Sequence, residues 1–324
     1  MNFYNKLNNL TGWTIFLIAS LVYIITSEPT ASFWDCGEYI ATAYKLQVGH
    51  PPGAPLFQII GRFFALFAFG DNLLVARMIN TMSALSGSFT ILFLFWSITM
   101  LAKKLVGGSK EITKEQTILI LGSGAVGALA LTFTDSFWFS AVEGEVYAMS
   151  SFFTAIVFWA ILKWEQVADK PHADRWIILI AYLIGLSIGV HLLNLLAIPA
   201  ITFVYFYKKY PTVTFKGIVI TMGISLVLLS VVMYGIIPQT VGLFAATELL
   251  FVNTFGLPFH TGTIIFAIVL IALIVLGLKY TSLPDKRILM AIYGLAGILA
   301  LLFLSESSSF GSFLLRVIFI AMAY

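Results

Sequence analysis

The chain has 324 residues, of which 60% are hydrophobic and only 10% are charged, and its formal net charge is +3. A soluble domain carries about 25% charged residues, so this composition excludes a water-soluble globular protein. The mean hydropathy is +0.99, and apolar runs such as 218–237 are long enough to cross a bilayer as helices. The small, scattered net charge does not indicate nucleic-acid binding.

The first apolar run, at 13–25, has the length of a signal peptide. It lacks a small-residue cleavage site and many apolar runs follow it, so we expect a retained membrane anchor. The whole pattern predicts an all-α fold, a polytopic transmembrane helical bundle of about ten spans. The predicted spans lie at 13–26, 76–102, 117–134, 146–163, 176–190, 192–207, 217–237, 262–279, 288–304 and from 313 onward.

The last predicted span runs to Tyr324 without a flanking polar segment. We therefore expect residues 1–324 to form a single transmembrane module that is truncated at its C-terminus. On this interpretation the chain is the N-terminal part of a longer protein.

Basic residues predict how the chain crosses the membrane. They gather in four loops, at 103–114, 163–175, 208–216 and 279–287. The positive-inside rule makes these loops and the N-terminus cytoplasmic. The opposite loops carry the acids Asp35, Glu38, Asp71, Asp135, Glu143, Glu145, Glu248 and Glu306. Because the chain has compact outer loops and no eukaryotic sorting signal, we expect a bacterial inner membrane, with the acids facing the periplasm.

Segment 55–69 is apolar, but a crossing there would invert the orientation of every later loop. Gln58 and Arg62 lie four residues apart in it, on one helical face. We therefore expect a helix lying in the outer interface rather than a span. On this interpretation the first extracytoplasmic loop, 27–75, is long and structured and contains interfacial helices.

Two carboxylates, Asp35 and Glu38, directly follow the first span. In a helix they share a face, and their repulsion would raise the pKa of one of them, which suits proton abstraction from an alcohol. The alternative is a pair of ordinary solvated loop acids. The segment 50–55, of sequence HPPGAP, follows as a rigid turn that redirects the chain. Its first residue, His50, would either contact a phosphate or cap the preceding helix.

The second outer loop loosely repeats the first, with Ser-Phe-Trp, then Gly-Glu, then a tyrosine. Glu143 and Glu145 are two residues apart and would point in different directions in a helix, so we expect only one of them to face Asp35. If these acids bound a metal, hard Mg²⁺ would be the expected ion, since no His or Cys accompanies them. We expect no metal.

Other candidate residues have two interpretations each. The apolar stretch 177–207 must cross twice, with a turn near His191, whose side chain would satisfy the turn's backbone or contact a lipid-linked phosphate. Arg62 would extend to the interface or clamp a phosphate. Trp34 and Trp138 would stack against sugars or belong to an interfacial aromatic belt.

The first loop carries Asp35-Cys36-Gly37-Glu38 and then, at 50–57, His-Pro-Pro-Gly-Ala-Pro-Leu-Phe. This pattern resembles a family of membrane proteins that includes a vertebrate protein O-mannosyltransferase acting on IPT domains. More widely, the chain is similar to the GT-C glycosyltransferases. Those enzymes carry an essential acid near the end of the first span and take sugar from a polyprenyl-phosphate carrier.

The resemblance implies an inverting glycosyltransferase that moves a sugar, expected to be mannose, from a polyprenyl-phosphate carrier to Ser or Thr hydroxyls of exported proteins. It implies Asp35 as the catalytic base and Glu38 as the group that positions Asp35 or the acceptor. It implies no cofactor; the partners are the lipid-linked donor, a protein or glycan acceptor and membrane lipid. The substrate-binding residues would be Trp34, His50, Arg62, Trp138, Glu143, Glu145 and His191.

Two rival functions remain at this point, a flippase or transporter for a lipid-linked substrate and a non-catalytic membrane scaffold. Transporters place ionisable groups near the middle of the membrane. Here the acids gather in outer loops, which argues against ion-coupled transport but not against lipid flipping. A scaffold has no requirement for acids beside a rigid Pro-Pro-Gly turn.

Overall fold

A computed structural model describes residues 3–106, 112–280 and 294 of the chain. The regular elements among these residues are all helical, which confirms the predicted all-α class. The chain divides into two compact units, Met1–Thr221 and Met222–Tyr324.

The first unit contains the helices that surround the two outer loops. They are α1 (Phe3–Ile25), α2 (Cys36–Lys45), α3 (Pro55–Ala65), η1 (Leu66–Ala68), α4 (Asn72–Leu105), α5 (Lys114–Thr132), α6 (Asp135–Val142), α7 (Val146–Val167), α8 (Asp174–Ile188), η2 (Leu192–Leu196) and α9 (Ala197–Lys209). Helix α10 (Phe215–Ser230) runs across the division between the units. The second unit continues with η3 (Val231–Ile236), α11 (Ile237–Leu249), η4 (Leu250–Thr254) and α12 (Thr261–Tyr280).

Five stretches of the described residues are helical, long and apolar enough to cross a membrane, which indicates an integral membrane protein. They are Phe3–Ile25, Asn72–Leu105, Lys114–Thr132, Val146–Val167 and Phe215–Thr254. The prediction of about ten spans is therefore wrong for this part of the chain. Helices α8 and α9 have 15 and 13 residues, fewer than the roughly 20 that a span needs. They are short because a break at His191 divides the apolar stretch.

The span predicted at 217–237 does not end where we expected. Its helix continues to Thr254, as a stretch of 40 residues. Pro238 does not stop it, because the helix widens to a π-helix at Val231–Ile236, directly before the turn that holds this proline, and such a local change accommodates the missing N–H. The span predicted at 262–279 corresponds to a shorter apolar helix, Thr261–Leu276. The spans predicted at 288–304 and from 313 onward lie outside the described residues.

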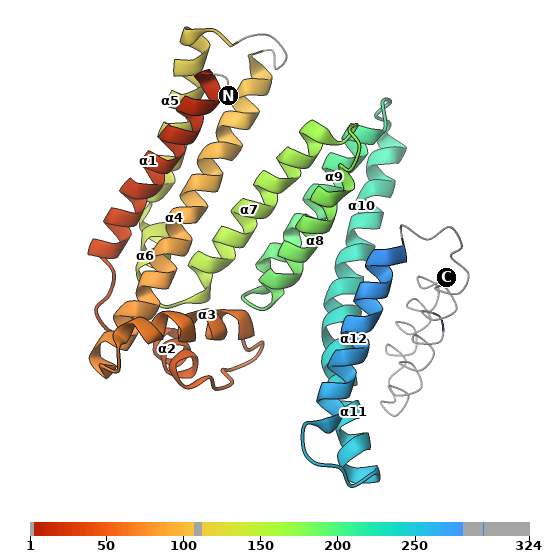
Figure 1. Cartoon of the computed structure of the whole chain (residues 1–324). Coiled ribbons are helices and arrows are strands. Elements are labelled where there is room, and N and C mark those ends of the chain that lie inside the picture. Colours follow the sequence, from red (N-terminus) through yellow and green to blue (C-terminus); the bar gives the residue numbers. More distant parts are fainter. Residues whose placement is uncertain (1–2, 107–111, 281–293, 295–324) are drawn as a thin grey trace. The chain divides into compact units, whose positions relative to one another are not determined.

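Two apolar clusters hold the first unit together. Helices α1, α4 and α5 run side by side (Figure 1) and share a core with α6 that includes Ile15, Ala19, Tyr23, Ile91, Phe95, Ala128 and Ala141. Helices α2 and α3 lie at the end of the unit where α4 and α7 begin (Figure 1). Their buried side chains pack against these two helices in a second core that includes Tyr39, Ile40, Phe57, Ile79, Val146 and Met149. The first outer loop is thus built onto the ends of α4 and α7.

Charge differs between the two ends of the first unit. The end with α2 carries the acids of both outer loops, whereas α4 and α9 finish at the other end in lysine pairs. There Lys104 forms an ion pair with Glu165, and Lys208 forms one with Asp169 at 2.8 Å. The predicted membrane orientation and the interfacial position of α3 stay predictions, although α3, with 11 residues, is too short to cross.

Candidate functional site

Asp35 and Glu38 lie together at the start of α2. Asp35 is the N-cap residue of this helix, and Glu38 lies in its first turn. Cys36 and Tyr39, which alternate with them, are buried in the core against α4 and α7. Packing of the buried side chains therefore turns both carboxylates outward, where Asp35 is 57% exposed and Glu38 39% exposed.

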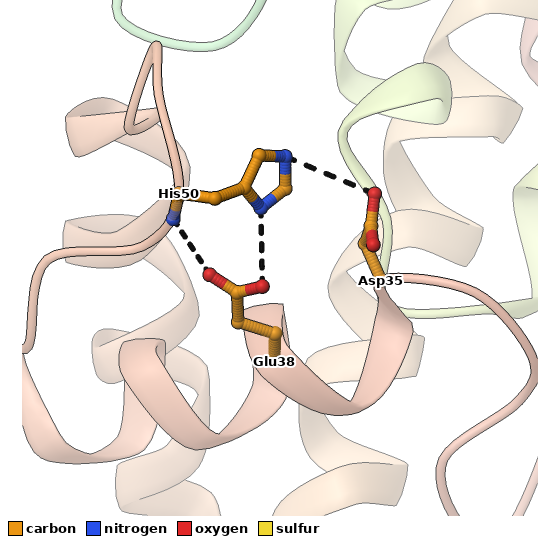
Figure 2. A group of neighbouring side chains, drawn as sticks. All are labelled: Asp35, Glu38 and His50. Atoms are coloured by element: carbon orange, nitrogen blue, oxygen red, sulfur yellow. Dashed lines mark hydrogen bonds and ion pairs between the residues drawn. The ribbon is translucent and has the colours of Figure 1, made fainter.

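The imidazole of His50 lies between the two carboxylates (Figure 2). The backbone N–H of His50 donates to Glu38 Oε1 at 2.6 Å, and its ring Nδ1 is 3.1 Å from Glu38 Oε2. The other ring nitrogen, Nε2, is 3.8 Å from Asp35 Oδ2. His50 thus joins the two acids. The predicted contact of His50 with a phosphate stays a prediction.

Hydrogen bonds to His50 control the charge of Glu38. The bond from the His50 backbone, followed by the bond from its ring, lowers the pKa of Glu38. The expected rise by repulsion from Asp35 therefore does not occur at Glu38. Glycine at position 49 permits this contact, because a Cβ there would lie 3.2 Å from Glu38 Oε1.

Asp35, Glu38 and His50 also form a set of metal-ligand types. One ligand atom from each lies within 4.8 Å of the others. Two carboxylates and an imidazole suit divalent cations such as Mn²⁺ or Zn²⁺ as well as harder ions. Our argument against a metal relied on the absence of a histidine near the acids of the second loop. Folding brings a histidine to the first pair instead, and the expectation that no metal binds stays a prediction.

The second outer loop contributes a third carboxylate, Glu145. This side chain is only 4% exposed, and burial, followed by the charges of Glu143 and Asp35, raises its pKa to about 7. A hydrogen bond from the backbone of Asp35, followed by the charge of His50, acts in the opposite direction. Glu145 therefore faces the first pair.

Glu143 has different neighbours, although it is equally buried. Burial raises its pKa, and a hydrogen bond with the Ser32 side chain partly opposes that rise. Its Oε2 has no hydrogen-bond partner among the described residues. The expectation that only one of the two loop acids faces Asp35 thus agrees with these neighbours, although the backbone at both positions is extended and not helical as the spacing argument assumed.

The two candidate tryptophans lie in different surroundings. Trp34 directly precedes Asp35, is 89% exposed and has a positive φ of 59°. Trp138 instead packs against Tyr23 and donates its ring N–H to Thr26 Oγ1 at 2.9 Å. Trp34 is therefore available beside the acids, whereas Trp138 ties α6 to the end of α1.

Arg62 and His191 lie apart from the three-residue cluster. Arg62 donates to the backbone oxygen of Tyr44 at 2.9 Å, at the opposite end of α2 from Asp35. With Tyr44 it lines a shallow depression of about 250 Å³. His191 accepts a hydrogen bond at Nδ1 from the backbone of Leu193 at 3.2 Å, and burial lowers its pKa. In this conformation neither side chain reaches the acids.

Sequence reasoning missed Asn80, a residue of α4 with no exposed surface. Its Nδ2 donates to the backbone oxygens of Glu28 at 2.7 Å and Thr30 at 2.9 Å, so it holds the segment that leads to Asp35. A Cβ on Gly144 would lie 2.8 Å from Asn80 Oδ1, so the second outer loop passes closely here. An asparagine inside an apolar predicted span was the available signal.

Comparison with known proteins places this site within a matched segment. A family model described as "Protein O-mannosyl-transferase TMEM260 N-terminal domain" matches residues 35–214. The protein O-mannosyl-transferase tmem260 of Dictyostelium discoideum is 26% identical over 185 residues, 56% of this chain and 21% of that protein. Protein O-mannosyl-transferase TMEM260 of Mus musculus is 26% identical over 175 residues, 54% of this chain and 22% of that protein. The matches thus span about a fifth of these relatives, and no solved structure matches the chain.

Proposed function

The chain belongs to the family of the protein O-mannosyl-transferase TMEM260 N-terminal domain, and from that membership we propose that it is the membrane-embedded part of an inverting, GT-C type glycosyltransferase. Its donor would be a sugar on a polyprenyl-phosphate carrier, with mannose as the sugar. Its acceptor would be a Ser or Thr hydroxyl of an exported protein. The observation that carries this proposal is the grouping of Asp35, Glu38 and His50 at one end of the helices, with Glu145 facing them.

In the proposed reaction Asp35 acts as the general base. The acceptor oxygen attacks the anomeric carbon from the side opposite the phosphate, and the sugar–phosphate bond breaks with its electron pair leaving on the phosphate. Asp35 takes the hydroxyl proton as the new carbon–oxygen bond forms. A phosphate leaving group is a weak base and requires little general-acid assistance. The exposure of Asp35 supports access by an acceptor from water.

The distribution of charge supports an extracytoplasmic site. Acids and the His50 cluster lie at the end of the first unit opposite the lysines that finish α4 and α9. With the lysines in the cytoplasm, the acids would face the periplasm of a bacterial inner membrane. A site at that interface would receive a lipid donor from the bilayer and a protein acceptor from the aqueous side.

The roles of the other candidate residues follow from their distance to this cluster. Trp34 would stack against the transferred sugar or the acceptor, since it is exposed directly beside Asp35. Glu145 would line the side of the site formed by the second outer loop. Arg62 or His191 would contact the donor phosphate only if the donor extended beyond the cluster. Trp138 would act indirectly, by joining α6 to the end of α1.

Transfer by the full-length protein in liposomes tests the proposal. Radiolabelled polyprenyl-phosphate-mannose and Ser/Thr-containing acceptors would be supplied to wild type, Asp35→Asn and the matched control Asp135→Asn, another acid of the outer loops. We expect Asp35→Asn to lower transfer at least about 100-fold, the usual scale for loss of a general base. Asp135→Asn should retain the wild-type rate.

Two results would contradict the proposal. Full transfer by a folded Asp35→Asn protein would remove Asp35 from the catalytic role. Failure of the wild type with several lipid-linked sugars, in a membrane where it remains folded, would favour a flippase or scaffold.

A further inference from the structure

The imidazole of His50 is anchored through one of its two nitrogens. Glu38 accepts a bond from the backbone of His50 at 2.6 Å and lies 3.1 Å from its Nδ1. An ionised carboxylate accepts hydrogen bonds and donates none, so Nδ1 must carry the hydrogen of that contact. The neutral ring then has a lone pair on Nε2, the nitrogen directed at Asp35 (Figure 2).

The distance between His50 Nε2 and Asp35 Oδ2 shows that these two atoms do not form a hydrogen bond. At 3.8 Å it exceeds the range of about 2.7–3.2 Å in which nitrogen and oxygen share a hydrogen. Two lone pairs therefore face each other without a proton between them. Once Asp35 gains a proton, its O–H has an acceptor directly in front of it, and a small side-chain movement forms the bond.

We propose that His50 receives the proton that Asp35 takes from the acceptor hydroxyl, and that Glu38 is the positioning residue that holds His50 for this transfer. The inference rests on the proposed function, in which Asp35 is the base. The Asp35 O–H bond breaks and an Nε2–H bond forms, while the electron pair of the broken bond restores the carboxylate. The imidazolium, paired with Glu38, then loses its proton to water across its exposed surface, which is 42% of the side chain.

Titratable groups face His50 from α2 and from the second outer loop. Asp35 and Glu38 approach it from the start of α2. The Tyr39 ring lies 5.8 Å from the imidazole ring, centroid to centroid. Glu145 faces it from the segment before α7, since the charge of His50 acts on the pKa of Glu145. Glu38, and Asp35 once it has given up the proton, place negative charge beside the imidazolium that the transfer forms.

The substitution His50→Gln separates proton transfer from positioning. A glutamine amide can still donate a hydrogen bond toward Glu38, but it cannot accept a proton from Asp35. If the only role of His50 is its hydrogen bond to Glu38, His50→Gln should keep the wild-type rate of transfer. If His50 carries the proton, we expect His50→Gln to lower transfer at least tenfold and to alter the dependence of the rate on pH.

Chemical rescue provides the decisive measurement in the full-length protein. Imidazole added to His50→Ala should restore transfer in proportion to the concentration of its neutral form, whereas it should leave His50→Gln unchanged because the glutamine occupies the space. His172→Gln, a histidine substitution near the lysines, serves as the matched control with an unaltered rate. Monodisperse elution in detergent and an unchanged melting temperature would establish that each variant is folded.

The outcomes distinguish this inference from the proposed function. Wild-type transfer, an inactive Asp35→Asn and a fully active His50→Gln at every pH would overturn the inference and leave the proposed function in place. Transfer that is abolished by a chelator and restored by Mn²⁺ would assign the gap between Nε2 and Oδ2 to a metal and overturn proton transfer. Absence of wild-type transfer with several lipid-linked sugars would overturn both.

Discussion

The two outer loops each carry a pair of acids, but their surroundings differ. Asp35 and Glu38 are exposed and share the imidazole of His50. Glu143 and Glu145 are each 4% exposed. Hydrogen bonding to His50 lowers the pKa of Glu38, whereas burial raises the pKa of Glu145 to about 7. The pKa values of two glutamates of one site are thus shifted in opposite directions.

This difference shows how one site can be open to a substrate and still hold its two loops in fixed positions. The exposed pair can meet a substrate while Glu38 remains ionised. The buried pair joins the two loops, since the backbone of Asp35 donates to the Glu145 carboxylate. A protonated Glu145 keeps this connection with less repulsion from Asp35 and Glu143. The first pair therefore suits chemistry, and the second pair suits positioning.

Breaking the contact of Asn80 on α4 with the segment that leads to Asp35 should have the largest effect on stability. Asn80→Ala removes the donors to the backbone oxygens of Glu28 and Thr30. Each of these part-buried bonds contributes about 0.5–1.5 kcal/mol, and the fully buried Asn80 side chain leaves a void, so we expect a loss of about 2–4 kcal/mol in the free energy of unfolding. Denaturant titration in detergent measures it, together with faster amide exchange at 28–35.

A serine on the same helix provides the control for Asn80. Ser83 is also buried, and its hydroxyl has no hydrogen-bond partner among the described residues. Ser83→Ala should therefore leave the free energy of unfolding nearly unchanged. If both variants lost the same free energy of unfolding, the loss would reflect any truncation of a buried side chain on α4. The two hydrogen bonds of Asn80 would then not account for its effect.

The second prediction concerns a variant, Glu145→Gln, in which one acid of the buried pair can no longer ionise. The pKa of Glu145 rises from 4.5 to about 7 on folding, so the folded protein binds the proton more tightly than the unfolded chain. Ionisation then destabilises the fold progressively between about pH 4.5 and 7, and this penalty persists above pH 7. We expect Glu145→Gln to stabilise the protein by at most about 3 kcal/mol at pH 8 and not at pH 4.

The pH dependence distinguishes this effect from a general gain in stability. Glu115 is an exposed glutamate whose pKa is lowered, so Glu115→Gln should give no gain at pH 8. Thermal melting at pH 4, 6 and 8 would compare the two variants with wild type. A gain from Glu145→Gln that is the same at all three pH values would contradict the assigned cause.

Local features of the site could be predicted from the sequence, whereas contacts between distant segments could not. The three-residue spacing of Asp35 and Glu38 correctly predicted a shared face at a helix start. His50 is 12 residues from Glu38, and only the path of the intervening turn decides which nitrogen meets which carboxylate. Asn80 is 52 residues from Glu28 in sequence, so nothing local indicates that its amide binds that carbonyl.

The fold class followed from composition, but the number of spans depended on where helices break. The sequence of the apolar stretch 177–207, through its length and its basic flanks, correctly indicated a break near His191, the residue directly before η2. It did not show that the helices on either side, α8 and α9, are too short to span. Nor did it show that the helix continues through Pro238, because tolerance of this proline depends on the π-helical hydrogen bonds of the turn before it.

The third prediction concerns the exposed pair and has the smallest expected effect. Folding lowers the pKa of Glu38 below 4.5, through its bonds to His50. Glu38 therefore contributes stability above about pH 4.5, and this contribution disappears as the pH falls through its lowered pKa. Glu38→Gln should destabilise the protein slightly at pH 7 and converge with wild type in acid. A double-mutant cycle with His50→Ala, which removes the ring contact, assigns the effect to the pair. If Glu38→Gln costs the same in both backgrounds, the two side chains are uncoupled. A smaller loss in the His50→Ala background means that the contact between the side chains stabilises the fold.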